Sequence, residues 1–212
     1  MNACFESSLL INPQEELLIA GVDEVGRGCI FGSVVAAAVV LPLSDIPKLV
    51  ELGIKDSKKL SAKKRNELVE PIQQVVSGWQ VAEASVGEID SLNILQASLL
   101  AMKRAVVALE PIPEMCLIDG SFKIRDLKLN QQTIVKGDNL SSAIASASIL
   151  AKVWRDSAIA NLAIQYPEYD LVSNKGYPTQ KHRLAIQTYG ICDLHRKTFA
   201  PCRNVPLRRK SD

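Results

Sequence analysis

The run GSVVAAAVVL, residues 32–41, constrains the fold more than any other stretch of the chain. It is apolar almost throughout and does not alternate with polar residues, so a strand here must be buried on both faces. A shorter apolar run at 17–24 predicts a strand before it, and Pro42 ends it. Two consecutive strands, followed by further strands that alternate with helices, indicate a mixed α/β sheet.

The rest of the chain supplies those alternating elements. Further strands are expected at 79–86, 115–120 and 133–138, and helices at 61–76, 92–109, 142–162 and 179–190. The helix at 92–109 has the strongest pattern, because its large apolar residues recur at spacings of three and four. Ser61 and Thr179 are expected to cap the helices that follow them, and Gly190 to end the last one.

Length and composition indicate one globular domain. A chain of 212 residues with 47% hydrophobic and 23% charged residues can bury a sizeable core. We expect a single domain over 1–212, with an ordered core at about 17–202 and a flexible tail at 203–212.

Charge and cysteine content narrow the class of protein. The 25 Lys and Arg against 23 Asp and Glu give a net charge of +2, so an argument for an acidic partner must come from local clusters. Five scattered cysteines without a CxxC pair favour a reducing compartment, and the cytoplasm is expected. No membrane span is expected, because the longest apolar run is interrupted and falls short of the ~20 residues required.

Acidic residues end three of the expected strands. Asp23 and Glu24 follow the first apolar run, Asp119 follows MCLI, and Asp138 follows TIVKG. Carboxylates at neighbouring strand ends can converge at one sheet edge, where divalent cations relieve their repulsion. The alternative is that each acid is an ordinary turn residue, as is common for Asp beside Gly.

An all-oxygen ligand set would suit Mg²⁺ or Mn²⁺ rather than Zn²⁺. Paired ions of this kind serve phosphoryl transfer, in which one activates the attacking water and the other stabilises the leaving oxygen. Asp23 and Glu24 are adjacent and would point to opposite faces of an ideal strand, so they can share a site only if the strand twists or ends there. Gly26 would permit such a bend.

Eight ordered motifs carry a resemblance to a known family. They are GVDEVGRG at 21–28, DSKKLS at 56–61, LNILQASLLAM at 92–102, LIDG at 117–120, VKGD at 135–138, SASILAKVWRD at 146–156, KGYPTQKH at 175–182 and HRKTFAP at 195–201. Together they closely resemble the ribonuclease HII family. The resemblance implies a ribonuclease-H-like fold, with a mixed central sheet flanked by helices and a helical C-terminal part.

The resemblance also implies an activity. The family are endoribonucleases that hydrolyse the RNA strand of RNA/DNA hybrids and nick duplex DNA 5′ of embedded ribonucleotides, leaving 5′-phosphate and 3′-hydroxyl ends. By motif match the catalytic, metal-binding carboxylates are Asp23, Glu24, Asp119 and Asp138. Mg²⁺ or Mn²⁺, two ions with substrate bound, is the implied cofactor, and a monomer is expected.

The substrate contacts implied by the family lie in two loops. Gly26, Arg27 and Gly28 would recognise the 2′-hydroxyl of the ribonucleotide, and close main-chain approach by the glycines is consistent with that role. Tyr177 would stack on the sugar at the RNA-to-DNA junction. Arg27 could instead pair with a neighbouring acid, and Tyr177 could be a packed loop aromatic.

Basic residues would hold the duplex backbone. Ser57, Lys58 and Lys59 lie in the region that grips phosphates in the family, although a basic run is usually a solvated helix face. Lys152 and Arg155 could add to this contact or balance nearby acids.

Several positions depart from the family pattern around the GRG segment. They are Val25, Cys29, Ile30, Phe31 and Ser33. None of them removes an expected ligand or donor, so they bear on the rigidity of the loop rather than on activity.

Two other candidate sites carry weaker signals. Cys192, His195 and Cys202 with His182 form an incomplete zinc signature, and packing is the expected role of His195. The serines of the 142–162 region, including Ser148, are expected to cap and pack the helix.

Overall fold

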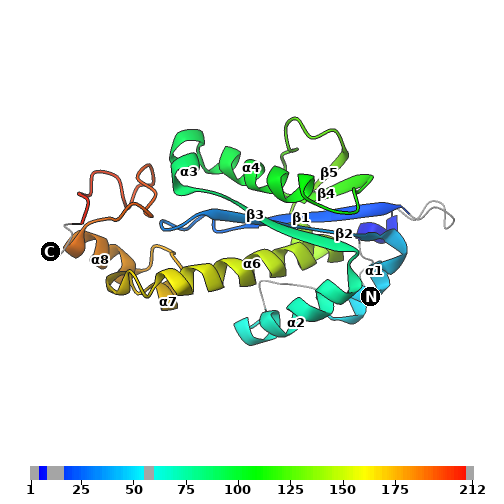
Figure 1. Ribbon diagram of the computed structural model, residues 1–212, viewed down its shortest axis with the longest axis horizontal. Helices are drawn as coiled ribbons and strands as arrows, with labels where there is room; N and C mark the ends of the chain where they lie inside the picture. The colour runs from blue at the N-terminus through cyan, green and yellow to red at the C-terminus, as the bar shows by residue number, and fades with distance from the viewer. Residues whose placement is uncertain (1–4, 9–16, 55–59, 209–212) are drawn as a thin grey trace.

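The computed structural model describes residues 5–8, 17–54 and 60–208, which form one central sheet covered by helices (Figure 1). The sheet has five strands in the order β3-β2-β1-β4-β5. The strands are β1 (Leu18–Val25), β2 (Val34–Pro42), β3 (Gly78–Ala84), β4 (Met115–Asp119) and β5 (Asn130–Ile134). β1 runs antiparallel to β2 and parallel to β4, so the expected mixed sheet is confirmed.

Helices cover both faces of this sheet. One face carries α3 (Val86–Leu92) and α4 (Ile94–Val107), and the other carries α1 (Ile46–Glu51), α2 (Ala62–Val75) and α6 (Ser142–Leu162), as Figure 1 shows. Short elements complete the chain: 3₁₀ turns at Phe5–Ser8, Leu43–Asp45 and Pro167–Tyr169, and helices α5 (Gly137–Leu140), α7 (Leu171–Asn174) and α8 (Gln180–Tyr189). Because apolar and polar residues do not alternate in β2, the sequence predicted that both faces of the strand are covered, and β2 is buried along nearly its whole length.

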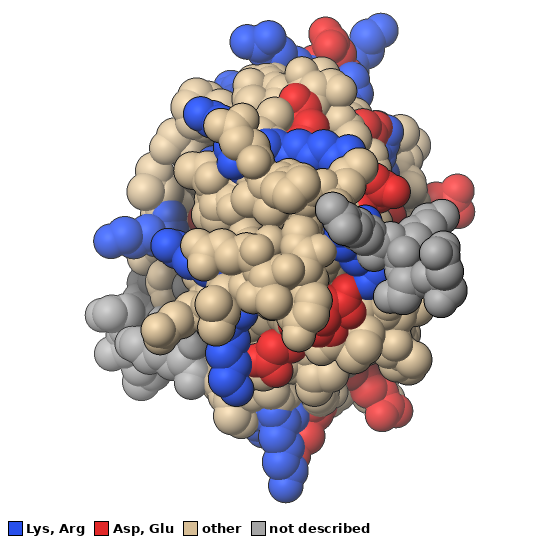
Figure 2. Space-filling model, turned by 90° about the vertical axis from the view of Figure 1, so that its left-hand side faces the viewer, with Lys and Arg blue, Asp and Glu red and all other residues tan. Residues whose placement is uncertain are grey.

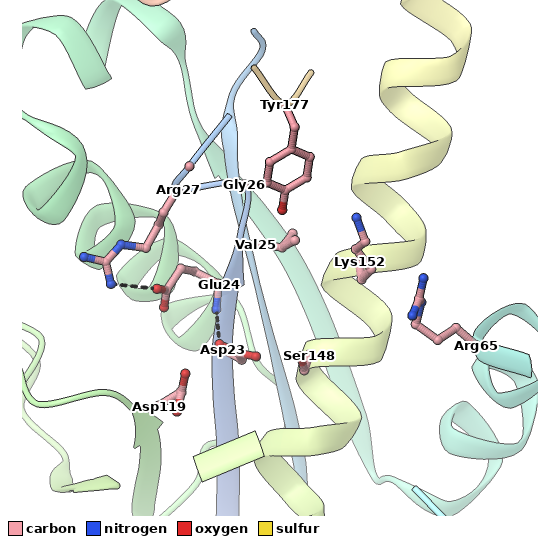
Figure 3. A pocket seen from close by; sticks show the side chains of 11 residues that line it. Asp23, Glu24, Val25, Gly26, Arg27, Arg65, Asp119, Ser148, Lys152 and Tyr177 are labelled. Atoms are coloured by element: carbon pink, nitrogen blue, oxygen red, sulfur yellow. Dashed lines mark hydrogen bonds and ion pairs between the residues drawn. The ribbon is translucent and has the colours of Figure 1, made fainter. Parts of the chain in front are cut away.

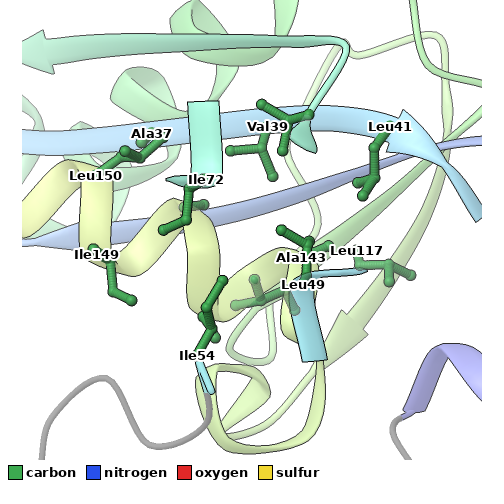
Figure 4. Packing of buried hydrophobic residues seen from close by; sticks show 14 of the residues in the cluster. Ala37, Val39, Leu41, Leu49, Ile54, Ile72, Leu117, Ala143, Ile149 and Leu150 are labelled. Atoms are coloured by element: carbon green, nitrogen blue, oxygen red, sulfur yellow. The ribbon is translucent and has the colours of Figure 1, made fainter. Parts of the chain in front are cut away.

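The two faces of the sheet carry separate apolar cores. Val39, Leu41 and Ile72 belong to the core beneath α6 and α2 (Figure 4), whereas Val40 and Met102 belong to the core beneath α4. A third cluster around Phe31 and Tyr169 holds the helical C-terminal part together.

Gly21 sets the distance between β1 and α6. A Cβ atom at this position would lie 2.1 Å from the carbonyl carbon of Ala143 and 2.4 Å from its oxygen. Only a residue without a side chain lets the helix start this close to the strand. The close contact places the acidic end of β1 against α6.

Three sequence predictions of secondary structure need correction. The helix expected over 92–109 is α4, which starts at Ile94: Asn93 adopts φ 72° and caps α4 with its own side chain, so Leu92 belongs to the preceding helix α3. Val86 opens α3 rather than extending a strand, since Ser85 and Glu88 form a capping box there. The strand expected over 133–138 ends at Ile134.

The C-terminal segment contacts the rest of the protein over more of its length than the sequence predicted. Residues 203–208, predicted to be part of a flexible tail, include a bridge between Ile191 and Leu207 and an ion pair between Arg208 and Glu168. Within the described ranges, no helix combines the length and apolar character required to cross a membrane.

Candidate functional site

The acidic residues of β1 and β4 lie at the same edge of the sheet. The two strands are parallel and pair Val22 with Ile118, so Asp23 and Asp119 are the next residues along each strand. Both line one cavity of about 420 Å³, together with Glu24 (Figure 3). β1 continues to Val25, and Glu24 turns toward the opposite side from Asp23 while still reaching this cavity.

Asp23 is the most electrostatically perturbed of these acids. It is only 3% exposed, and burial raises its pKa well above the usual value, with the charges of Glu24 and Asp119 raising it further. A hydrogen bond with Ser148 and one from the Glu24 N–H to Oδ1 (2.7 Å) offset part of this shift in the pKa. The site therefore concentrates negative charge where water does not fully stabilise it.

Glu24 has a cationic partner. Its Oε1 lies 3.0 Å from Nη1 of Arg27, drawn as a dashed line in Figure 3. Burial raises the pKa of Glu24, and Arg27 acts in the opposite direction. The salt bridge left open by the sequence is thus present, although the side chain of Arg27 remains 49% exposed.

Asp138 occupies a different position from the one expected. Lys136 adopts a left-handed conformation at φ 57°, which takes the chain out of β5 and into α5, so Asp138 lies in the first turn of a short helix. It is 1% exposed, and its Oδ1 accepts a hydrogen bond from Asn139 at 3.1 Å. Asp119 accepts a hydrogen bond from the N–H of Gly137 at 2.7 Å. Gly137 directly precedes Asp138, so this bond connects Asp119 to the residue next to Asp138.

The side chains do not form a ready-made metal cluster. Among residues 5–8, 17–54 and 60–208, no three Asp, Glu, His or Cys side chains gather closely enough to hold an ion. Asp23, Glu24 and Asp119 share the cavity, whereas Asp138 is not among the residues that line it.

The GRG segment and Tyr177 meet above the acids. Gly26 has φ +92°, and a Cβ there would lie 2.3 Å from Nε of Arg155. The glycine thus makes the expected bend and also admits a neighbouring side chain. Gly28 is exposed, and a Cβ on it would be 3.9 Å from Cε1 of Tyr177, so the ring lies beside this glycine. Both residues line the cavity.

Two buried arginines hold the main chain of this region. Arg155, 1% exposed, donates to the carbonyls of Phe31, Ser33 and Lys175. Arg196, 0% exposed, donates to the carbonyls of Arg27, Gly32 and Ser33. Arg155 was expected to contact the duplex backbone or to balance an acid, but it is buried and its guanidinium group donates to these main-chain carbonyls.

The residues that depart from the family pattern fit this packing. Cys29, Ile30 and Phe31 are all buried, and Phe31 meets the ring of His195 edge-on at 5.0 Å between centroids. The backbone N–H of Ile30 donates to Gly176 at 2.9 Å. The GRG and KGYP loops are therefore joined through buried contacts.

Cationic and polar residues line the opposite wall of the cavity. Lys152 lies 2.8 Å from Asp156 and 5.6 Å from the ring centroid of Tyr177, so it balances an acid and also borders the site. Arg65 and Ser148 line the same cavity and were not expected as site residues. The signal for Ser148 is its spacing of four from Lys152, which puts both on one side of α6.

Ser57, Lys58 and Lys59, which are expected to grip backbone phosphates, lie outside the described residues. Among the described residues on the face shown in Figure 2, near α8 and α3, Lys and Arg are interspersed with Asp and Glu.

The histidines and cysteines near the C-terminus pack rather than form a zinc site. Nδ1 of His195 lies 3.3 Å from Sγ of Cys192, and its Nε2 lies 3.1 Å from Nε2 of His182. Sγ of Cys202 instead faces the carbonyl of Ile30 at 3.9 Å. These contacts agree with the packing role expected for His195.

Known proteins share this sequence and fold. The sequence model of ribonuclease HII matches residues 20–202. The ribonuclease HII of Nostoc sp. (strain PCC 7120 / SAG 25.82 / UTEX 2576) is 55% identical over 189 residues, covering 89% of this chain and 84% of that protein. The crystal structure of ribonuclease H2 from Pyrococcus horikoshii OT3 superposes with a TM-score of 0.75 at 26% identity, covering 88% of this chain and 96% of that one. Bst-RNase HIII, solved in complex with Mn²⁺, shares the fold with a TM-score of 0.68 at 21% identity over 90% of this chain and 69% of that one.

Proposed function

Since this chain belongs to the ribonuclease HII family, and is thus an endoribonuclease that cleaves the RNA of RNA/DNA hybrids, we propose that it cuts at the carboxylate cavity. The observation that carries this assignment is the meeting of two kinds of group in one cavity. Acids from two parallel strands, Asp23 and Asp119 among them, line it together with the GRG segment and Tyr177. Chemistry and ribose recognition would then take place within one small volume.

The acids are suited to a divalent cation. Their donor set is all oxygen, which Mg²⁺ and Mn²⁺ prefer. Burial first, and the charges of Glu24 and Asp119 second, raise the pKa of Asp23, and a bound cation would favour its charged form. We assign Asp23, Glu24, Asp119 and Asp138 as the ligands of two ions. When bound, such ions supply an activated water and stabilise the leaving oxygen. The chain itself would position the acids, with Ser148 fixing Asp23 and Arg27 fixing Glu24.

We propose that the loops above the acids select the cleavage point. Gly26, Arg27 and Gly28 would present main-chain groups to the 2′-hydroxyl, and Tyr177 would stack on the sugar that follows the ribonucleotide. These contacts would allow a duplex with one ribonucleotide to be nicked 5′ of that residue, leaving a 5′-phosphate and a 3′-hydroxyl. The exposure of Gly28 and the adjacent ring of Tyr177 support this assignment.

Phosphate contacts would come from the cationic wall. Lys152 is already at the cavity, and Ser57, Lys58 and Lys59 are proposed to extend the contact along the duplex. We further propose a monomer that works in the cytoplasm. The buried free thiols of Cys29, Cys116, Cys192 and Cys202 are consistent with a reducing compartment.

The test compares three duplexes in Mg²⁺ or Mn²⁺ and in chelator: an RNA/DNA hybrid, a DNA duplex with one ribonucleotide, and an all-DNA duplex of the same sequence. We expect metal-dependent cleavage of the first two only, with the new 3′ end extendable by a DNA polymerase. Equal cleavage of the all-DNA duplex would indicate a general nuclease of this fold. Binding of hybrids without cleavage would indicate a non-catalytic protein.

A further inference from the structure

The chain contains two histidines, and they touch each other beneath the KGYP loop. His182 lies in the first turn of α8, and His195 lies in the segment after that helix. Both are 0% exposed, and their Nε2 atoms are 3.1 Å apart. The rings of Phe31 and Tyr169 pack around the pair.

The outer contacts of the pair fix the position of every ring proton. Nδ1 of His182 lies 3.0 Å from the carbonyl oxygen of Tyr177, which can only accept, so this nitrogen carries a proton. At the other end, the backbone N–H of Cys192 donates to Nδ1 of His195 at 3.0 Å. Nδ1 of His195 is therefore an acceptor and carries no proton. The contact between the two Nε2 atoms then has one arrangement, in which His195 donates to His182.

The result is a one-way chain of hydrogen bonds between neutral rings. It runs from the N–H of Cys192 through His195 and His182 to the carbonyl of Tyr177, and it requires opposite tautomers in the two histidines. Burial lowers the pKa of both, which agrees with neutral rings, although the hydrogen bond to the Tyr177 carbonyl and, to a smaller extent, the charge of Asp170 raise the pKa of His182. A second proton on His182 would set two N–H groups against each other at the central contact.

We propose that His182 and His195 are positioning residues that hold Tyr177 for ribonucleotide recognition. The same carbonyl also accepts from the N–H of Thr179 at 2.8 Å, so the peptide of Tyr177 is held from two directions. A fixed peptide keeps the ring beside Gly28 at the cavity. This inference rests on the role proposed above for Tyr177.

The first experiment examines the proton positions directly. With ¹⁵N-histidine incorporated into untagged, metal-free protein, long-range ¹H–¹⁵N spectra show two rings, one from each histidine. We expect the Nδ1–H tautomer for His182 and the Nε2–H tautomer for His195 at neutral pH. Identical tautomers, or a charged ring at that pH, would overturn the chain of hydrogen bonds. A His182→Asn variant assigns the two signals.

The second experiment separates positioning from general stability. His182→Asn keeps an amide N–H near the place of Nδ1, whereas His182→Leu keeps similar bulk without a donor. On a duplex with one ribonucleotide, we expect His182→Leu to lower kcat/KM about tenfold, which corresponds to about 1.4 kcal/mol. His182→Asn should recover most of that loss, and both variants should have similar melting temperatures.

Coupling to Tyr177 is the decisive comparison. In a Tyr177→Ala background, His182→Leu should cost no further activity, because the group it positions is already absent. A full additional tenfold loss would overturn the positioning role and make the pair structural. Wild-type rates for Tyr177→Ala alone would overturn the role of Tyr177, and with it the positioning, whatever tautomers the spectra show.

Discussion

Gly21 offers a direct test of how the fold sets the geometry of the site. In Gly21→Ala, the added methyl would lie 2.1 Å from the carbonyl carbon of Ala143, whereas carbon atoms pack at about 3.5–4.0 Å. β1 and the start of α6 must therefore separate by more than about 1 Å. Overpacking of this kind costs about 1–3 kcal/mol in the free energy of unfolding.

The same displacement should affect catalysis. Asp23 lies two residues after Gly21 on β1, and Ser148, which hydrogen-bonds it, lies on α6. A misplacement of about 1 Å can cost about 100-fold in rate, so Gly21→Ala should lose about that much cleavage under conditions where it is still folded. Urea unfolding midpoints and single-turnover cleavage measure the two effects.

Gly87→Ala is the matched control. Gly87 lies in α3, and a Cβ there would meet only Oγ of Ser85 at 3.9 Å, an ordinary contact. This variant should keep wild-type cleavage and gain about 0.5–1 kcal/mol of stability, as expected for alanine over glycine in a helix. Wild-type stability and cleavage in Gly21→Ala would refute the claim that this contact sets the site.

Three further predictions concern the charges of the site and the core. Asp119→Asn should abolish cleavage but leave folding and duplex binding intact, because the amide oxygen can still accept from Gly137; a loss of folding would make Asp119 a structural acid. Mg²⁺ or Mn²⁺ should raise the melting temperature of the wild type more than that of Asp23→Asn, and equal metal responses would contradict ligation by Asp23. In chelator, without metal, Asp23→Asn should melt at a higher temperature than the wild type, because burial and nearby acids raise the pKa of Asp23 and so disfavour its charged form. Burial lowers the pKa of His195 from 6.5 to about 3 in the folded protein, so below pH 6.5 the unfolded chain binds a proton that the folded protein does not. The free energy of unfolding therefore decreases as the pH falls below 6.5. From about pH 7.5 to about pH 5.5 in chelator, the wild type should lose at least about 1.4 kcal/mol more than His195→Asn in urea unfolding, and equal losses would show that His195 is not held neutral.

The sequence predicted the acidic edge because strand ends can be recognised from where apolar runs stop. It predicted Asp119 at the last residue of β4 and Asp23 near the end of β1 correctly. It placed Asp138 wrongly, because β5 can extend only as far as its partner. β4 ends at Asp119, which pairs with Ile134, and beyond that point the chain has no strand to bond with.

The helix boundary at Asn93 was missed for a related reason. Leu92 lies at helical spacing from Leu95 and the apolar residues after it, so periodicity alone starts the helix at Leu92 and does not show that this residue belongs to a separate helix. The structure ends α3 there because Asn93 adopts φ 72° and its side chain caps the next helix. Leu92, counted in the predicted apolar face, is 43% exposed as a result.

The buried arginines could not be recognised from local pattern. Arg155 lies in a motif with Lys152, and nothing in the spacing separates a phosphate contact from an internal one. Only the tertiary fold shows that the guanidinium group of Arg155 is satisfied by carbonyls from two loops. The same holds for Arg196, whose partners lie more than 150 residues earlier in the chain.

These buried donors have one kind of acceptor in common, the main-chain carbonyl group. Arg155, Arg196 and His182 each donate a hydrogen bond to a main-chain carbonyl of the GRG or KGYP loop. The ribose recognition that we propose for these main-chain groups would be accurate only if the main chain does not move, and loops are ordinarily the more mobile parts of a fold. Burying two cations costs free energy, which their hydrogen bonds must offset. The arrangement therefore favours a fixed main chain in these two loops over maximal stability.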